Sequence, residues 1–258
     1  MCIRDRSITR LELQNYLDGM LRVSEISDYC PNGLQVEGAS KIEKIVTGVT
    51  ASQALVDAAI EAKADALIVH HGYFWKGESQ VIAGMKKRRL QALLSNDINL
   101  FAYHLPLDVH PEFGNNRQLA SLLGIQNISA VSGVKPVGVV MHGNFEEEIE
   151  GAALQVKLQK LLGRDVLIEG PVSKPISKLA WCTGGGQGFI EQAVELGVDA
   201  FITGEVSEQT VHTAREMGIT FFAAGHHATE RYGVKSLGEH IGQQFDVPVE
   251  FIDIDNPA

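Results

Sequence analysis

The sequence has few cysteines, no long apolar run and fewer basic than acidic residues, and each shortage argues against a class of protein. Its three cysteines, Cys2, Cys30 and Cys182, show no CxxC spacing, which argues against a cysteine-ligated zinc site and is typical of a reduced cytoplasm. No window reaches the roughly 20 apolar residues of a membrane helix. The 22 Lys and Arg against 32 Asp and Glu give a net charge of -10, so we expect no nucleic-acid or anionic-membrane partner. The sequence predicts a cytoplasmic protein.

The first six residues, MCIRDR, differ in character from the chain that follows them. They are what ATG-TGT-ATA-AGA-GAC-AGN encodes, which resembles a transposon end sequence used in sequencing-library adapters. We interpret residues 1–6 as a non-native N-terminal artefact and exclude them from functional reasoning.

What the sequence does contain is a regular alternation of helical periodicity and short apolar runs. Helices are predicted over 7–21, over 52–64 with Ser52 as N-cap, and over 85–97, and strands over 41–50, 65–72 and 98–104. The same alternation resumes from residue 178 to 254. The strands are apolar throughout, as expected where both faces are buried. The predicted fold class is α/β, with mixed sheets and helices packed on them.

The second stretch of alternation repeats the first. Residues 44–72 align without gaps on residues 178–206, and the aligned pairs include Gln53 with Gln187 and Asp65 with Asp199. A shared hydrophobic pattern alone would not align polar residues, so we favour a duplicated half-domain. The predicted domain is made of 7–125 and 175–258. Between them, 126–174 is expected to form a small inserted α+β lobe, with strands over 135–143 and 165–170 and a helix over 145–163.

Imidazole and carboxylate side chains gather where the predicted strands end. In the first half these are His70, His71, His104 and, four residues on, Asp108; in the second they are Glu205, His226, His227 and Glu230. The carboxyl ends of the strands of an α/β sheet line one edge, where ligands bind. Imidazole with carboxylate suits Zn, Mn, Fe, Co or Ni, so the sequence predicts a metal site.

The spacing divides these residues into classes. Successive strand residues point to opposite faces, so His70 and His71 are expected to bind two different ions bridged by a carboxylate. His226 and Glu230 have i,i+4 spacing and can share an ion, and "HLPLD" is expected to be a loop that places Asp108. For His104, His227 and Glu205 we leave open a contact with the ligands or substrate against an ordinary polar role. His110, His142, His212 and His240 are interpreted as surface or structural.

Two further motifs each have two interpretations. "TGGGQ" at Thr183–Gln187 is either a phosphate cradle at a helix N-terminus or a tight turn, and it lacks the Lys-Ser/Thr of a P-loop. Tyr73, Phe74 and Trp75 either stack on a planar substrate or cap the core or a subunit contact.

The motifs "IVTGVTAS", "ALIVHHGYFWKG", "YHLPLD…GNN", "TGGGQ", "DAFITGE" and "AAGHHATE" resemble the Nif-three-like dinuclear-metal proteins, often labelled GTP cyclohydrolase I type II homologues. The resemblance runs from about Ile26 to the C-terminus and is to the bacterial short form. It implies a duplicated α/β fold and a toroidal homohexamer whose metal sites face an internal cavity. It carries the ligands onto His70, His71, Asp108, His226 and Glu230, with Glu230 as the bridge.

The functional prediction is a dinuclear-metal hydrolase with two divalent ions, Zn, Fe or Mn, acting on a nucleotide-like or cyclic amide or phosphoester substrate. GTP ring-opening is one candidate, and no catalytic side chain is assigned, although Glu205 or His104 could serve as a base. The rival hypotheses are a non-catalytic metal-binding or metal-delivery protein and a regulatory partner-binding protein.

Overall fold

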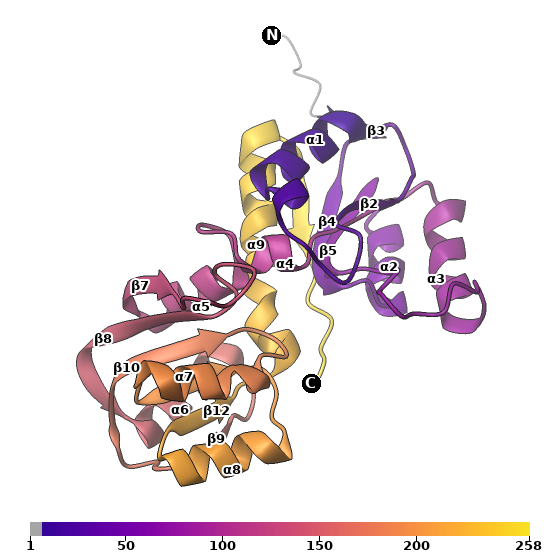
Figure 1. Cartoon of the computed structure of the whole chain (residues 1–258). Coiled ribbons are helices and arrows are strands. Elements are labelled where there is room, and N and C mark those ends of the chain that lie inside the picture. Colours follow the sequence, from indigo (N-terminus) through magenta and orange to yellow (C-terminus); the bar gives the residue numbers. More distant parts are fainter. Residues whose placement is uncertain (1–6) are drawn as a thin grey trace. The chain divides into compact units, whose positions relative to one another are not determined.

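The computed structural model describes residues 7–258, so the predicted artefact at residues 1–6 lies outside the described residues. The chain divides into two compact units (Figure 1). Unit 1 runs to Leu107 and takes in Val234–Asp255, and unit 2 comprises Asp108–Gly233 and Asn256–Ala258.

Unit 1 is built around a five-stranded sheet with the strand order β13-β4-β5-β6-β2. Strands β4, β5, β6 and β13 are parallel where they pair, and β2 runs antiparallel to β6. A separate two-stranded ribbon joins β1 and β3. The elements are β1 (Ile8–Thr9), α1 (Arg10–Met20), η1 (Val23–Glu25), β2 (Gly33–Val36), β3 (Lys41–Ile42), β4 (Ile45–Thr50), α2 (Gln53–Glu61), β5 (Ala66–His71), α3 (Gly84–Ser95), β6 (Asn99–Ala102), α4 (Leu105–Asp108), the later part of α9 (His226–Phe245) and β13 (Val249–Phe251).

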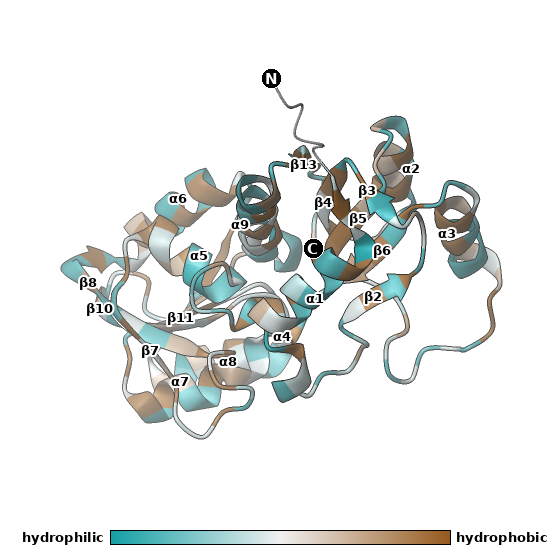
Figure 2. Cartoon of the chain, turned by 90° about the horizontal axis from the view of Figure 1, so that it is seen from above, coloured by the Kyte–Doolittle hydropathy of each residue, from teal (hydrophilic) through white to brown (hydrophobic). Residues whose placement is uncertain are grey.

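Both faces of this sheet are buried, as the uniformly apolar strands predict. On one face Ile45 and Ile68 pack in a cluster with Leu13 of α1 and Leu237 of α9. On the other face Leu67 and its neighbours pack against the buried leucines of α2 and α3. Strands β4 and β5 are accordingly coloured as hydrophobic along most of their length in Figure 2. The two faces therefore follow the alternation of side chains along each strand.

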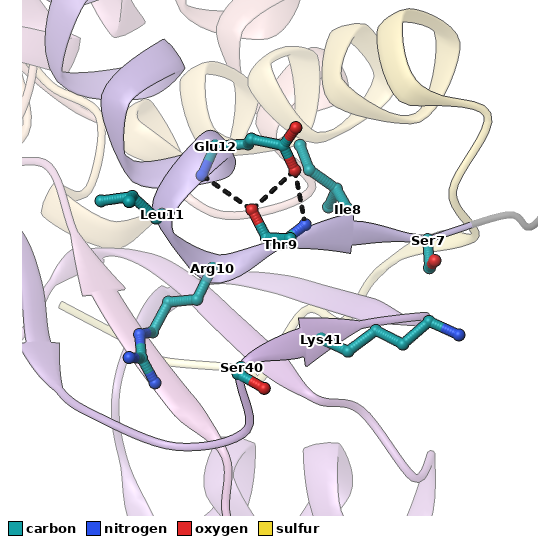
Figure 3. A pocket seen from close by; sticks show the side chains of 8 residues that line it. All are labelled: Ser7, Ile8, Thr9, Arg10, Leu11, Glu12, Ser40 and Lys41. Carbon is teal, nitrogen blue, oxygen red and sulfur yellow. Dashed lines mark hydrogen bonds between the residues drawn. The ribbon is translucent and has the colours of Figure 1, made fainter.

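The first two helices of unit 1 begin at side-chain caps, of which only Ser52 was predicted; α1 begins at Arg10, three residues later than expected. At α1 the Thr9 hydroxyl accepts from the Glu12 backbone N–H at 3.2 Å, while the Glu12 carboxylate accepts from the Thr9 backbone N–H at 3.0 Å (Figure 3). Such a capping box satisfies two N–H groups that a helix start leaves open. Ser52 caps α2 as predicted, by accepting from Leu55 N–H. The pocket around this first cap, drawn in Figure 3, is lined by none of the predicted metal ligands.

Unit 2 is built around a six-stranded mixed sheet with the strand order β7-β8-β10-β11-β12-β9. Its hydrophobic core includes the fully buried Trp181 together with leucines of α5 and α6. The elements are α5 (Asn115–Leu123), β7 (Gln126–Ala130), β8 (Met141–Glu150), α6 (Gly151–Leu162), β9 (Leu167–Glu169), β10 (Pro175–Cys182), η2 (Gln187–Phe189), α7 (Ile190–Leu196), β11 (Ala200–Thr203), α8 (Glu208–Met217), β12 (Thr220–Ala223) and the first part of α9.

The elements of the segment 126–174 differ from those expected. The helix predicted over 145–163 is wrong in its first turns, because residues 145–150 continue β8, whose Ile149 pairs with Ile176 of β10. Pairing along a strand outweighs the helix propensity of three consecutive glutamates. The strands of this segment, β7, β8 and β9, pair within the sheet of unit 2. The lobe and domain boundaries given above stay a prediction.

Each unit contains three parallel strands, β4-β5-β6 in unit 1 and β10-β11-β12 in unit 2, and the strands pair in the same register in both. Ile45 pairs with Ala66 between β4 and β5, and the aligned residues Leu179 and Ala200 pair between β10 and β11. The aligned aspartates make equivalent hydrogen bonds. Asp65 accepts from the backbone N–H groups of Glu43 and Lys44, and Asp199 accepts from those of Ser177 and Lys178. The predicted α/β fold of repeated halves is confirmed. No helix between residues 7 and 258 is long and apolar enough to cross a membrane.

Candidate metal centre

Three histidines of unit 1 come together at the carboxyl ends of neighbouring parallel strands. His70 and His71 end β5, and His104 follows the end of β6. The ring centroids are 4.5 Å apart for His70 and His71, 5.1 Å for His70 and His104, and 5.7 Å for His71 and His104. One ring nitrogen of each lies within 4.8 Å of the other two, and such a group could hold a metal ion. The binding of His70 and His71 to two different ions stays a prediction.

Each of these imidazoles is anchored through the same atom. The Nδ1 of His70 lies 2.9 Å from the carbonyl oxygen of Tyr103, that of His71 lies 3.1 Å from Thr50 Oγ1, and that of His104 lies 2.8 Å from Asp28 Oδ1. A carbonyl or carboxylate oxygen only accepts, so Nδ1 of His70 and His104 carries the proton. In a neutral ring the lone pair is then on Nε2, the state in which imidazole binds a metal.

Asp28 is the carboxylate that fixes His104, and the sequence analysis did not find it. Its Oδ1 accepts from the Tyr29 backbone N–H and from His104, and its Oδ2 accepts from the Asn32 amide and the Leu105 backbone N–H. Burial alone would raise the pKa of Asp28, but the hydrogen bond and charge of His104, with the other donors, lower it. Asn32 also accepts from the His104 backbone N–H at 2.7 Å. The 28–32 loop thus holds His104 at two points.

In unit 2 the first turn of α9 presents His226 and Glu230 on one face, as the i,i+4 spacing predicts. His226 Nε2 lies 3.2 Å from Glu230 Oε2, and its Nδ1 lies 2.7 Å from Glu205 Oε1. Burial lowers the pKa of His226, but the two carboxylates outweigh it and raise the pKa to about 9. Glu205 also accepts from the Gln187 amide. Glu205 is therefore a carboxylate that orients His226, one of the two roles left open for it.

Asp108 is buried in unit 2 with Glu230. The "HLPLD" stretch is not the expected loop but the one-turn helix α4, which ends at Asp108. Asp108 Oδ1 accepts from the Asn115 amide at 2.8 Å, and one of its carboxylate oxygens lies within 4.8 Å of one of Glu230. Burial, together with the charges of these two carboxylates, raises the pKa of the Cys182 thiol. Cys182 thus stays a neutral, buried thiol, as its apolar context predicts.

The "TGGGQ" loop packs directly against this carboxylate and imidazole. Gly184 has a φ of +68°, and a Cβ there would clash with the Glu230 carboxylate and lie 3.1 Å from His226 Nε2. The backbone N–H groups of Gly184 and Gly186 donate to the hydroxyls of Thr229 and Thr203. These internal bonds and the neighbouring carboxylates favour the tight-turn interpretation over a phosphate cradle.

The three aromatic residues after His71 have separate roles. Tyr73 is buried and its hydroxyl donates to the Ala51 carbonyl, so it belongs to the core. Phe74 is exposed, with Lys86 over its ring. Trp75 contacts the imidazoles, with its ring edge-on to His104 at 4.9 Å and 5.9 Å from the His71 ring, centroid to centroid.

The remaining histidines lie outside these groups. His240 Nε2 is 2.6 Å from the Tyr16 hydroxyl, and His110 Nδ1 accepts from the backbone N–H groups of Glu112 and Phe113. Within residues 7–258, the groups of side chains able to hold a metal do not include His110, His142, His212, His227 or His240. The buried His227, for which a contact with ligands was left open, has its backbone N–H bonded to the Ala258 carbonyl.

The residues present fit divalent metal ions. Of the five predicted ligands, His70 and His71 belong to unit 1, and Asp108, His226 and Glu230 belong to unit 2. Each unit offers borderline nitrogen or oxygen donors that are held by second hydrogen bonds, the combination that metal ligands require. The sequence analysis missed Thr50 as the partner of His71. Thr50 ends β4, the strand beside β5, so a search of every strand end for polar residues would have found it. Asp28 carries no local signal.

Known proteins resemble the whole chain. The model of the family Duf34/NIF3 (NGG1p interacting factor 3) matches residues 8–257. A Yersinia pestis protein named "GTP cyclohydrolase 1 type 2 homolog" is 57% identical over 249 residues, 96% of this chain and 99% of the relative. The protein of that name from Escherichia coli (strain K12) is 55% identical over 248 residues, 96% and 98% of the two chains.

Solved structures agree with the family match. One titled "Structural genomics, protein ybgI, unknown function" has a TM-score of 0.92 and 54% identity, and the match covers 97% of this chain and 100% of that one. The crystal structure of TTHA1606 from Thermus thermophilus has a TM-score of 0.88 and 36% identity over 97% and 100% of the two chains. Because the family model and these relatives span nearly the whole sequence, the chain belongs to the Duf34/NIF3 family.

Proposed function

We propose that the protein is a dinuclear-metal hydrolase of the cytoplasm, active as a homohexamer. Its two divalent ions, Zn, Fe or Mn, are held by His70, His71, Asp108, His226 and Glu230. The ligand set combines imidazole and carboxylate without thiolate, which suits these borderline ions.

The observation that carries the proposal is the common anchoring of the imidazoles. His70, His71 and His226 each have Nδ1 within hydrogen-bond distance of an oxygen, so each ring can present Nε2 to an ion once that nitrogen carries no proton. A histidine with only a structural role needs no such consistency. A second partner that fixes ring orientation is the usual accompaniment of a metal ligand.

When bound, two such ions supply Lewis acidity, polarising the attacked bond and making water a better nucleophile at neutral pH. The chain's own residues set up this chemistry. Thr50 and the Tyr103 carbonyl fix the rings of His71 and His70, and Glu205 accepts a hydrogen bond from the Nδ1 of His226. The burial of Asp108 and Glu230 excludes water from the carboxylates, which strengthens their attraction for a cation.

The names of the relatives suggest where a substrate search should begin. The bacterial proteins that are 55% and 57% identical to this chain carry the name of a GTP cyclohydrolase homologue. Hydrolytic opening of a nucleobase ring is therefore one candidate within metal-dependent hydrolysis. Phosphoesters and cyclic amides are the others, because two ions can stabilise the oxygens of either transition state.

The test is metal analysis of anaerobically purified protein, followed by a substrate screen with the metal that is found. The panel contains GTP, other nucleotides, phosphodiesters and cyclic amides. We expect two ions per chain and turnover of one substrate class, and Glu230→Gln should lose both metal and turnover. The matched control is His212→Gln, which changes an exposed histidine of α8 and should behave as the wild type.

Two outcomes would contradict the proposal. Fully loaded protein that turns over nothing in this panel would favour metal storage or delivery over hydrolysis. Wild-type protein that retains no divalent ion after anaerobic purification and reconstitution would contradict metal binding itself.

A further inference from the structure

We propose that residues 77–88 of one chain, the arm, bind residues 145–150 of β8, the acidic edge, in a second copy of the same chain. Lys87 and Arg88 of the arm then pair with the glutamates at 146–148. The inference names a contact surface of the proposed oligomer and rests on that part of the proposed function. It depends neither on the number six nor on hydrolysis.

The arm is an exposed segment that connects the end of β5 to the first turn of α3. Residues 76–85 are exposed without interruption, among them Val81 at 71%, Ile82 at 57% and Met85 at 56%. A Cβ added at Gly77 would have nothing within 4 Å. Figure 2 shows this part of the chain as a long connection at the rim of unit 1. Three large apolar side chains thus lie in solvent on one short segment.

The grouping of these apolar side chains indicates an interaction surface. Single exposed apolar residues are common and need no explanation, whereas contiguous ones mark sites of contact with proteins or membranes. Val81 and Ile82 are adjacent, and Met85 follows three residues later. The charge of the chain favours a protein partner, because a net charge of -10 opposes the approach of the molecule to an anionic membrane.

The end of the arm belongs to the longest basic run of the chain, Lys-Lys-Arg-Arg at 86–89. Lys86 is used within unit 1, where it lies 3.5 Å from the Glu78 carboxylate. Lys87 and Arg88 are exposed and form no ion pair with any residue from 7 to 258. Cations in the first turn oppose the dipole of a helix, so these two residues do not stabilise α3 itself. An acidic surface is the partner that suits them.

The acidic edge is a surface of that kind, and every copy of the chain carries it. The glutamates at 146–148 and Glu150 are exposed. Ile149 pairs with Ile176 of β10 on one side. Strand β7 pairs with β8 only between residues 141 and 144, so among the described residues no strand lies along the other side of 145–150. An open strand edge binds extended segments of other chains, and its charges decide which ones.

The charges of the two surfaces favour a contact between copies. Glutamates along the edge repel the edge of another acidic chain and attract a basic arm. The arm belongs to unit 1 and the edge to unit 2, so the contact joins two different surfaces. Such a heterologous contact lets each copy offer its arm to one neighbour and its edge to another, and it closes into a ring when the rotation permits. The apolar residues of the arm supply buried area, and the charges set the orientation.

The experiment measures the mass of full-length chains by light scattering coupled to gel filtration. Lys87→Glu/Arg88→Glu places like charges in the contact, and the oligomer should dissociate at a concentration where the wild type stays assembled. Glu147→Lys/Glu148→Lys should have the same effect. An equal mixture of these two variants should recover the wild-type mass, because each acidic arm then meets a basic edge. A chain that carries all four substitutions should assemble by itself.

Two controls separate the contact from folding. Arg117→Glu/Lys160→Glu makes the same change of charge at exposed positions of unit 2 and should keep the wild-type mass. Urea denaturation should find Lys87→Glu/Arg88→Glu as stable as the wild type, because glutamates in the first turn favour α3.

The apolar part of the arm has its own variant. Val81→Ser/Ile82→Ser should raise the protein concentration of half-dissociation by about tenfold or more, because these side chains lose apolar burial in the contact. Its unfolding by urea should match that of the wild type, because both side chains are exposed in the single chain.

The outcomes separate the inference from the rest of the proposed function. Charge variants that both keep the wild-type mass, or a mixture that stays dissociated, would overturn the contact. So would anionic vesicles that bind the wild type and not Lys87→Glu/Arg88→Glu while the masses agree, which would make the arm a membrane surface. A dimeric or trimeric wild type with recovery in the mixture would leave the inference standing and contradict the homohexamer. A monomeric wild type would contradict both, and none of these masses bears on hydrolysis.

Discussion

At the scale of single residues, His226 makes the stability of the metal-free protein depend on pH above neutrality. The ring lies between Glu205 and Glu230, which raise its pKa to about 9 against an ordinary value of 6.5, although burial opposes them. Its proton therefore stabilises the folded, metal-free chain fully below pH 6.5, and this contribution is lost as the pH rises through about 9.

We expect the free energy of unfolding of metal-free wild type to fall more steeply than that of His226→Gln between about pH 6 and about pH 10. The measurement is urea denaturation at each pH in the presence of a chelator. Glu205→Gln should give an intermediate slope, because one of the two carboxylates remains. Parallel curves for all three proteins would show that His226 does not bind this proton. Metal must displace the same proton, so metal affinity should rise over the same range.

Gly184 gives a prediction with a built-in control. Gly184→Ala adds a Cβ at a φ of +68° against the Glu230 carboxylate, whereas Gly197→Ala adds one at +70° with nothing within 4 Å. Both should lose about 1 kcal/mol or more from backbone strain. Only Gly184→Ala should also lose bound metal, as measured by elemental analysis. Equal metal content in the two variants would contradict the close packing of Gly184 on the site.

The residue types of the site could be predicted from sequence, but their partners could not. Paired histidines and carboxylates at strand ends are a local pattern, so the sequence singles out His70, His71, His226 and Glu230, which the structure places in groups able to hold a metal. Asp28 acts on a histidine 76 residues away, and nothing in its own loop marks it. A hydrogen bond between distant loops depends on how the chain closes, which periodicity does not contain.

At the scale of elements, the aligned aspartates Asp65 and Asp199 stabilise the same turn in each half. Asp65 and Asp199 each accept two backbone N–H groups at the start of the first strand of a half. Their alignment in the sequence therefore reflects a shared turn rather than a shared ligand. Burial alone would raise the pKa of Asp199, but the bonds from Lys178 and Ser177, with Lys174, lower it.

We expect Asp65→Ala and Asp199→Ala each to cost about 1–3 kcal/mol of unfolding free energy, because two N–H groups lose their acceptor. The losses should add in the double variant, because the residues share no partner. The part of the Asp199 contribution that comes from its charge is present above pH 3.8 and is lost as the pH falls through the lowered value. Urea denaturation measures the unfolding free energy of the two single variants and of the double variant, with Asp57→Ala on the exposed face of α2 as control. A loss of unfolding free energy no larger than that of the control would contradict a stabilising role for these hydrogen bonds.

Elements with strong periodicity could be predicted, and elements decided by tertiary pairing could not. Helices α2 and α3 lie where the pattern predicts them, over 52–64 and 85–97. The error at residues 145–150 has a physical cause: their glutamates favour a helix, but β10 offers a strand partner. Whether residues 145–150 form a helix or a strand depends on pairing with β10, which lies too far along the chain to fall in the same sequence window.

At the scale of the whole molecule, we expect the assembly to be a homohexamer. Light scattering coupled to gel filtration should give a mass about six times the 28.0 kDa of one chain. Removal of metal with a chelator should leave the mass unchanged if the ligands all come from one chain. A monomer or dimer at micromolar concentration would contradict the hexamer but leave the metal sites untouched.

Helix α9 and strand β13 bear on the order in which the protein can fold during synthesis. Leu237 and Ile241 of α9 fill the core of unit 1, and β13 pairs with β4 beside it. Strands β4, β5 and β6 of unit 1 are therefore synthesised long before α9 and β13, which complete its core and its sheet. Domains usually fold in the order of their synthesis. Unit 1 cannot complete its core and sheet before α9 and β13 have been synthesised. A nascent chain stalled before Val234 should therefore remain sensitive to protease in unit 1.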